Sequence, residues 1–213
     1  MHTDLKQYYA KRSSEYDRIY SKPERQEDLQ ALSQLLPELL VERQLLEVAC
    51  GTGYWTQFVA PICTSILATD YNTEVLKLAE NRLAEKENVS FQQADAFNLN
   101  VQGAFNGGLS AFWWSHLEKE KIPSFLTEFH SKLLPGSRVV FVDNNFVSGS
   151  STPISREDEE GNTYQVRALL NGTQHEILKN FPSEQEFRAL VKPFSNKISF
   201  KSSEYFWCGW YDI

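Results

Sequence analysis

Cysteine and long apolar stretches are both scarce in this chain of 213 residues. The three cysteines, Cys50, Cys63 and Cys208, lie far apart and form neither a CxxC motif nor a Cys/His cluster. This pattern argues against a structural zinc site and a disulfide framework, so a reducing compartment is the simplest interpretation. No stretch approaches the roughly 18 apolar residues of a transmembrane helix, and the polar N-terminus lacks the apolar core of a signal peptide. We therefore expect a cytoplasmic protein with no membrane partner.

Positive charge is also in deficit, with 21 Lys and Arg against 28 Asp and Glu, a net charge of −7. Such a chain is a poor match to nucleic acid, whose phosphates select a positive surface. The hydrophobic fraction of 41% and the charged fraction of 23% are typical of globular proteins and exclude a disordered chain. The length indicates a single domain over residues 1–213. Aromatic residues make up 13% of the chain, which suggests a pocket as well as a core.

Strand-like and helix-like segments alternate along the chain. This alternation predicts an α/β fold, a Rossmann-like sheet of seven mostly parallel strands with helices on both faces and an antiparallel C-terminal strand. We expect the strands at residues 44–50, 65–69, 89–94, 105–113, 138–143, 198–200 and 205–211. We expect helices at residues 55–62, 72–87, 123–134 and 183–191, the third ending at Pro135 and Gly136.

The first 40 residues are expected to form a helical cap. Tyr8 and Tyr16 share one aromatic face at helical spacing. Ser21 is expected to cap a second helix, with Glu24 completing a capping box.

Residues 144–182 are expected to form an insertion after the fifth strand. Asn171-Gly172 lies between two strand-like runs, which is a strong signal for a β-hairpin. A two-residue turn there sets Ala168 opposite His175 and Arg167 opposite Glu176. A hairpin is not stable alone, so we expect it to pack over the site as a lid or wall.

Polar or glycine-bearing segments follow five of the predicted strands. They are Gly51-Thr52-Gly53, Asp70, Asp95, residues 113–116 and residues 143–145. Ligands of such sheets bind beyond the carboxyl ends of the strands, so these segments predict one binding edge. A carboxylate at Asp70 can accept both hydroxyls of a ribose. The dinucleotide fingerprint has a third glycine, and Trp55 stands near that position, which favours a ligand without a pyrophosphate.

The ordered motifs EVACGTGYWT, TD at Asp70, AD-AF at Asp95 and FWWSHLE resemble those of the class I S-adenosylmethionine-dependent methyltransferases. The helix YYAKRSSEYDRIY is similar to that of the small-molecule branch of this family, and the likeness covers essentially the whole chain. The resemblance implies S-adenosylmethionine as cofactor and S-adenosylhomocysteine as product. The family often has glycine where this chain has Ala49.

The resemblance also implies roles for the matched positions. Gly51 and Gly53 would pass under the methionine part of the cofactor, and Glu47 would orient that loop. Asp70 would hold the ribose, and Tyr71 would flank the adenine. Asp95 and Ala96 would contact the adenine amino group. Trp113 or Trp114 would lie beside the sulfonium. Tyr8 or Tyr16 would lie at the methionine end or the acceptor site. Asp95 as a helix cap, Tyr71 as a surface turn residue and the tyrosines as core are the alternatives.

Two histidines are candidate bases, because an unperturbed imidazole titrates near neutrality. His116 follows the fourth strand and is the preferred catalytic residue, with a structural role as the alternative. His175 on the hairpin is a second candidate that would contact substrate. Arg167 could bind an acidic acceptor, but its expected pairing with Glu176 is the simpler interpretation. Residues 143–145 resemble a metal set superficially, and we expect no metal.

The sequence predicts methyl transfer to a small molecule, at oxygen first and nitrogen next. Aromatic residues near the site favour a planar or apolar acceptor. The alternatives are an RNA or protein methyltransferase, a non-catalytic cofactor-binding partner subunit and a nicotinamide-dependent oxidoreductase. The hairpin is also a possible homodimer contact.

Overall fold

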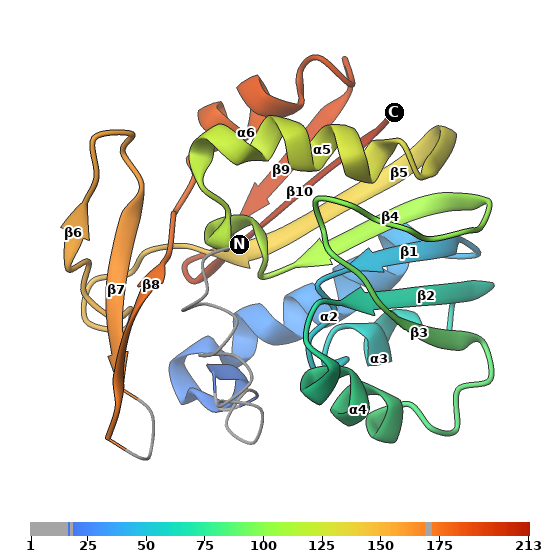
Figure 1. Cartoon of the computed structure of the whole chain (residues 1–213), viewed down its shortest axis with the longest axis horizontal. Coiled ribbons are helices and arrows are strands. Elements are labelled where there is room, and N and C mark those ends of the chain that lie inside the picture. The colour runs from blue at the N-terminus through green and yellow to red at the C-terminus, as the bar shows by residue number, and fades with distance from the viewer. Residues whose placement is uncertain (1–16, 18, 169–171) are drawn as a thin grey trace.

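The computed structural model describes residues 17, 19–168 and 172–213, and its central element is a seven-stranded sheet. The strand order is β3-β2-β1-β4-β5-β10-β9 (Figure 1). Strands β1 to β5 pair in parallel, and β10 is antiparallel to both of its neighbours. The predicted fold class is therefore confirmed. The strands are β1 Gln44–Val48, β2 Ser65–Asp70, β3 Val89–Gln93, β4 Phe105–Ala111, β5 Leu133–Asn144, β9 Ile198–Ser202 and β10 Phe206–Asp212.

Helices cover both faces of this sheet. Figure 1 shows α5 and α6 on one side and α2, α3 and α4 on the other. The helices are α2 Gln26–Leu40, α3 Thr56–Val59, α4 Thr73–Arg82, α5 Ile122–His130 and α6 Glu184–Val191. Short 3-10 turns precede or connect them: η2 Pro23–Arg25, η3 Trp114–His116 and η4 Lys119–Lys121.

The central strands carry apolar side chains on both of their faces because both faces are buried. Successive side chains point to opposite faces, so neighbours in sequence enter different cores. Leu45 packs in the cluster under α2 and α3, whereas Leu46 packs in the cluster under α5 and α6. Val140 and Phe141 divide in the same way.

Two glycines inside strands permit close packing of aromatic rings on the sheet. A Cβ at Gly108 would lie 2.8 Å from Cζ of Phe129 on α5, and a Cβ at Gly209 would lie 2.4 Å from Cζ of Phe187 on α6. Gly108 weakens the strand pattern in the sequence, but its missing side chain is what lets α5 approach β4.

Two predicted helix boundaries are wrong. Helix α5 ends at His130, and Pro135-Gly136 lies within β5, with Gly136 at a φ of 81°. Ser21 caps no helix, because α2 begins after Arg25 and has no side-chain cap. The capping box of this chain is instead at α6, where Ser183 accepts from the Glu186 backbone N–H.

The insertion forms a second, three-stranded sheet beyond the carboxyl ends of β4 and β5 (Figure 1). Its strands are β6 Arg156–Glu157, β7 Thr163–Ala168 and β8 Gln174–Leu178. The observed register sets Arg167 opposite His175 and Val166 opposite Glu176. The predicted register is therefore wrong by one residue, and this shift turns Arg167 to the face that it shares with His175.

The three cysteines are all free thiols buried in the structure. Burial raises the pKa of Cys63 to about 12 and that of Cys208 to about 12. Among residues 17, 19–168 and 172–213, none of the helices combines the length and apolar character needed to cross a bilayer.

The packing of Phe187 on Gly209 can be tested with Gly209→Ala. The added methyl group would overlap the ring, so we expect a loss of about 1–3 kcal/mol in the free energy of unfolding, measured by urea denaturation. Lys201→Ala, on the exposed part of β9, is the control and is expected to change stability by less than about 0.5 kcal/mol. A neutral Gly209→Ala variant would contradict the close approach of α6 to β10.

Candidate functional site

The turn that follows β1 is largely buried and adopts an unusual backbone conformation. Ala49, Gly51 and Gly53 have φ angles of 60°, 56° and 72°. This left-handed conformation favours glycine, so Ala49 occupies a position where glycine costs less. A Cβ at Gly53 would lie 3.1 Å from Cδ1 of Leu83 and 3.2 Å from Cβ of Ala79, so the loop packs directly on the helix α4 and the turn after it.

Asp70 ends β2 beside this loop, and the backbone holds its carboxylate in place. Oδ2 accepts from the Gly51 N–H at 3.0 Å, and Oδ1 accepts from the Asn72 N–H at 2.9 Å. Burial raises the pKa of Asp70 to about 6, and the backbone hydrogen bonds oppose this shift. The result is a fixed carboxylate at the edge of the sheet, suited to accept hydrogen bonds from ligand hydroxyls.

Glu47 lies beneath the same loop with 1% of its surface exposed. Its Oε2 accepts a hydrogen bond from Thr56 Oγ1 at 2.7 Å, which ties β1 to the start of α3. Burial raises the pKa of Glu47 to about 8, so its carboxyl group is largely protonated at neutral pH. The predicted role of Glu47 in orienting the loop stays a prediction, and in the structure Glu47 anchors the helix that follows the loop.

A segment near the N-terminus lies against the outer side of the loop. Asp17 accepts from Thr52 Oγ1 at 2.7 Å and forms an ion pair with Arg82. The ring of Tyr20 stacks on that of Tyr54, with centroids 3.7 Å apart. Tyr8 and Tyr16, which the sequence predicted at the cofactor or acceptor, lie outside the described residues.

Trp55 occupies the position of the missing third glycine, but its contacts are with other protein rings. Its side chain is 3% exposed, its Nε1 donates to the Tyr20 hydroxyl at 3.2 Å, and it stacks on Phe112. The structure therefore assigns Trp55 to the packing that supports the glycine loop.

The predicted adenine contacts lie at the ends of β2 and β3. Tyr71 is half-buried beside Asp70, and its carbonyl accepts from Gln93 Nε2 at 2.9 Å. Asp95 Oδ1 accepts from the Phe97 N–H at 3.0 Å, so it stabilises a turn rather than a helix. Ala96 is 5% exposed and packs in the core.

The two tryptophans after β4 lie in different surroundings. Trp113 is 8% exposed and precedes η3 at the edge of the sheet. Trp114 is 1% exposed and packs against Phe141, Phe187 and Trp207. We therefore assign Trp114 to the core instead of the acceptor site, because it presents almost no surface to a ligand.

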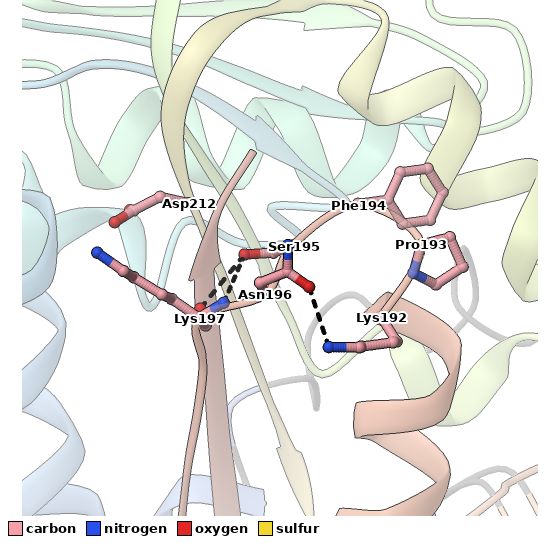
Figure 2. Close-up of a pocket in the computed structure, with 7 residues that line it drawn as sticks. All are labelled: Lys192, Pro193, Phe194, Ser195, Asn196, Lys197 and Asp212. Carbon is pink, nitrogen blue, oxygen red and sulfur yellow. Dashed lines mark hydrogen bonds between the residues drawn. The ribbon is translucent and has the colours of Figure 1, made fainter.

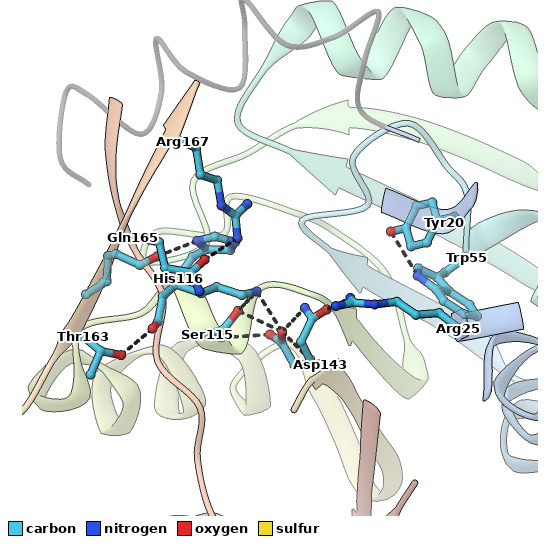
Figure 3. A network of polar contacts seen from close by, with 12 residues as sticks. Tyr20, Arg25, Trp55, Ser115, His116, Asp143, Thr163, Gln165 and Arg167 are labelled. Carbon is cyan, nitrogen blue, oxygen red and sulfur yellow. Dashed lines mark hydrogen bonds and ion pairs between the residues drawn. The ribbon is translucent and has the colours of Figure 1, made fainter. Parts of the chain in front are cut away.

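The turn η3 is built around the buried carboxylate of Asp143 at the end of β5 (Figure 3). Asp143 accepts from both the backbone N–H and the hydroxyl of Ser115, each at 2.8 Å. Lys179 Nζ lies 3.1 Å from Asp143 Oδ1 and forms a buried ion pair with it. Asn180 N–H donates to the Ser115 carbonyl at 2.7 Å, so the small sheet is anchored to η3.

His116 occupies the same turn and is 7% exposed. Its Nδ1 lies 2.8 Å from the carbonyl oxygen of Leu178, the last residue of β8. Because a carbonyl can only accept, Nδ1 carries the proton, and in the neutral ring Nε2 carries the lone pair. A histidine that acts as a base through Nε2 must have its lone pair on that atom, and this tautomer provides it.

The other candidates lie on the small sheet. His175 is half-buried, and its Nε2 lies 3.2 Å from the Thr173 hydroxyl. Glu176 pairs with Arg156 across the outer face, with Nη2 to Oε2 at 2.7 Å. The predicted pair of Arg167 with Glu176 is therefore wrong. Arg167 Nη2 donates instead to Gln165 Oε1 at 2.8 Å.

Sequence reasoning missed several residues around Asp143. Lys179 and Ser115 are the clearest, and Arg25 contributes from η2, with Nη1 3.5 Å from Asn144 Oδ1. The run of polar residues after the hairpin carries no signal that Lys179 is buried, because only the tertiary fold places Asp143 opposite it.

Two hollows lie away from this edge. One is lined by residues 192–197 and Asp212, where Lys192 Nζ bonds Asn196 Oδ1 at 3.0 Å (Figure 2). The other is lined by the starts of β1, β2 and β3. Both are at the amino ends of parallel strands, opposite to the glycine loop. Within the described ranges, no three His, Cys, Asp or Glu side chains are grouped as metal ligands.

Comparison with known proteins agrees with this geometry. A family model described as a methyltransferase domain matches residues 45–136, which contain the glycine loop, Asp70 and Asp95. The solved structure of a DhpI–SAH complex is 25% identical, covers 96% of this chain and 92% of that chain, and has a TM-score of 0.77. The chain is therefore similar to class I S-adenosylmethionine-dependent methyltransferases over the segment that carries these motifs. Two of the similar structures, that of DhpI and that of the N-methyltransferase NodS from Bradyrhizobium japonicum, are complexes with S-adenosylhomocysteine.

Two further proteins are similar to this chain. An O-methyltransferase of Pyrenophora dematioidea is 28% identical over 169 residues, which are 76% of this chain and 60% of that protein. The chain thus spans less than two thirds of the length of that curated relative. A DhpI–SAM–HEP complex is 24% identical, covers 99% of this chain and 98% of that chain, and has a TM-score of 0.79. That structure supports the fold.

The pH dependence of stability tests whether the Glu47 carboxyl group beneath the loop is protonated in the folded protein. A carboxyl pKa raised from 4.5 to about 8 means that the folded state holds its proton more tightly than the unfolded state. Its contribution to stability is complete below pH 4.5 and is lost as the pH rises through 8. Glu47→Gln has no carboxyl group at this position and is not subject to this loss. The difference in unfolding free energy, variant minus wild type, should therefore increase by about 1.4 kcal/mol per pH unit between pH 4.5 and about 8. Urea unfolding at several pH values measures the difference, and a pH-independent difference would show that Glu47 is ionised in the fold.

Proposed function

We propose that the chain transfers the methyl group of S-adenosylmethionine to an oxygen atom of a small-molecule acceptor. The observation that carries this proposal is the Asp70 carboxylate, which the backbone N–H groups of Gly51 and Asn72 fix beside the glycine loop. A loop without side chains and a fixed carboxylate suit a nucleoside whose ribose hydroxyls need an acceptor. The choice of oxygen is supported by the similarity to an O-methyltransferase.

The residues fit the cofactor in a consistent order along the edge. Asp70 would hold the ribose, Gly51 and Gly53 would lie beneath the methionine part, and Tyr71 would flank the adenine. Asp95 lies at the end of the next strand, in reach of the same nucleoside. When bound, the cofactor supplies a methyl group activated by a positively charged sulfur.

Transfer is an in-line displacement at the methyl carbon. The acceptor oxygen forms a bond to this carbon, and the carbon–sulfur bond breaks with its electron pair going to sulfur. A hydroxyl acceptor must also lose its proton, which a nearby base accepts. The protein contributes chiefly by holding the acceptor oxygen in line with the methyl group.

His116 is the proposed base for a hydroxyl acceptor. The hydrogen bond between Nδ1 and the Leu178 carbonyl, 2.8 Å, leaves the lone pair of the neutral ring on Nε2. The turn η3 places this ring at the carboxyl end of β4, the edge that carries the glycine loop and Asp70. The proton would move from the acceptor hydroxyl to Nε2 during transfer.

The cofactor site is tested by calorimetric titration of Asp70→Asn with S-adenosylhomocysteine. We expect the affinity to fall about tenfold or more, because the charge-assisted hydrogen bonds to the ribose are lost. Asp212→Asn is the matched control, since Asp212 pairs with Arg138 at the far end of the sheet. Wild-type protein that folds but does not bind S-adenosylhomocysteine would overturn the proposed function.

The base is tested with His116→Gln and a panel of small hydroxylated acceptors, with release of S-adenosylhomocysteine as the readout. We expect kcat to fall about 10²–10⁴-fold and the acidic limb of the pH–rate profile to disappear. His130→Gln is the control, because His130 lies at the end of α5 and bonds the hydroxyl of Tyr211 on β10. An unchanged pH profile in His116→Gln would show that His116 is not the base. Wild-type protein that binds the cofactor but methylates no acceptor would be a non-catalytic binding protein.

A further inference from the structure

Cationic side chains from three separate elements converge on the carboxyl edge of this acidic protein. Arg25 comes from η2, Arg167 from β7 and Lys179 from the segment after β8. Figure 3 shows the guanidinium of Arg167 beside His116, with Arg25 reaching the same network from the opposite side, and Lys179 bonds Ser115 and Asp143 between them. Positive charge gathered in one place is notable in a chain whose net charge is −7.

Arg25 is held in a fixed position without a carboxylate partner. It is 7% exposed, and its Nη2 and Nε lie 3.0 and 3.3 Å from Ser150 Oγ. Its guanidinium also lies over the ring of Tyr205, 5.3 Å from the centroid. The neighbouring Lys22 Nζ donates to the Ser150 carbonyl at 2.6 Å.

Arg167 faces inward because of the observed strand register. Its Nη2 bonds Gln165 Oε1 at 2.8 Å, while its Nε is buried and has no hydrogen-bond partner in the described part of the chain. A buried donor without a partner costs about 1–3 kcal/mol, so this donor is suited to a ligand acceptor. Arg156, on the outer face of the same small sheet, is by contrast satisfied by Glu176.

The acidic residues nearby do not balance these charges. Asp143 pairs with Lys179, and Glu24 lies 3.9 Å from Lys22. Over residues 17, 19–168 and 172–213, neither Arg25 nor Arg167 forms an ion pair with a carboxylate. Neither guanidinium charge is thus neutralised by a carboxylate in this part of the chain, and Arg167 Nε is a buried donor that an anion could satisfy.

We propose that Arg167 and Arg25, with Lys179 behind them, bind an oxyanion carried by the methyl acceptor, a carboxylate, a phosphate or a phosphonate. The inference rests on the proposed function, because it assigns a substrate class to the same site. Planar guanidinium groups match the oxygens of such anions and bind them with paired hydrogen bonds. The acceptor is then a small anion rather than the neutral planar molecule that the aromatic composition favours.

The electrostatics of Lys179 agree with this assignment. Burial lowers the pKa of Lys179 to about 8, Asp143 opposes the shift, and the positive charges of Arg167 and Arg25 add to it. An anion bound among these groups would relieve their mutual repulsion. It would also lie next to η3, so the acceptor would be anchored within reach of the proposed base.

The experiment is a calorimetric titration of the protein saturated with S-adenosylhomocysteine. The probes are phenylphosphonate and benzoate, with benzyl alcohol as the neutral analogue. We expect at least one anion to bind and the alcohol to bind much more weakly. The stronger of the two anions distinguishes a phosphate-like group from a carboxylate.

Three variants then locate the binding. Arg167→Gln is expected to weaken the anion about 10- to 100-fold, the value of a lost charge-assisted hydrogen bond. Arg167→Lys should restore part of this loss, because the charge returns without the fork. Arg156→Gln, which removes a cation from the outer face, should leave the affinity unchanged.

Either of two results would overturn the oxyanion site. One is equal binding of benzyl alcohol and the anions, or no binding of any anion. The other is an anion affinity that Arg167→Gln does not alter. S-adenosylhomocysteine binding in the same protein separates these results from a failure of the proposed function, since it must be present before the anions are added.

Discussion

The organisation of the site depends on one buried carboxylate. Asp143 is fully buried and accepts from the backbone and hydroxyl of Ser115, from the Asn144 N–H at 2.7 Å and from Lys179. These partners come from η3, the end of β5 and the insertion. The small sheet is therefore held on the central sheet by a buried ion pair. Removal of one partner from such a pair typically costs about 3–5 kcal/mol.

This constraint also bears on how one edge would hold both a donor and an acceptor. The glycine loop and Asp70 lie at the ends of β1 and β2, whereas η3 and Asp143 lie at the ends of β4 and β5. Strand β1 pairs with both β2 and β4, so the two halves are neighbours in a rigid sheet. Donor and acceptor would be held by different strands of the same sheet, which fixes their relative position without a moving part.

The features that the sequence could predict are those set by local patterns. Apolar strands ending in Gly51, Asp70 or Asp95 identify the sheet and its binding edge, because strand direction alone brings these ends together. The register of the hairpin could not be predicted in the same way. Asn171-Gly172 predicts a two-residue turn, yet the observed pairing of Arg167 with His175 differs by one residue. The burial of Trp114 and Lys179 likewise depends on contacts with distant elements, which no local pattern encodes.

The start of α2 is held by residues that are far away in sequence. Arg25 bonds Ser150, and the side chain of Asp28 accepts from the Tyr205 N–H at 2.8 Å, a separation of 177 residues. During synthesis these partners emerge long after α2, so the part of the chain made early is among the last to be fixed. A ribosome-bound chain that ends before Tyr205 would lack the hydrogen bond to Asp28, so the start of α2 is fixed only when the end of the chain has been made.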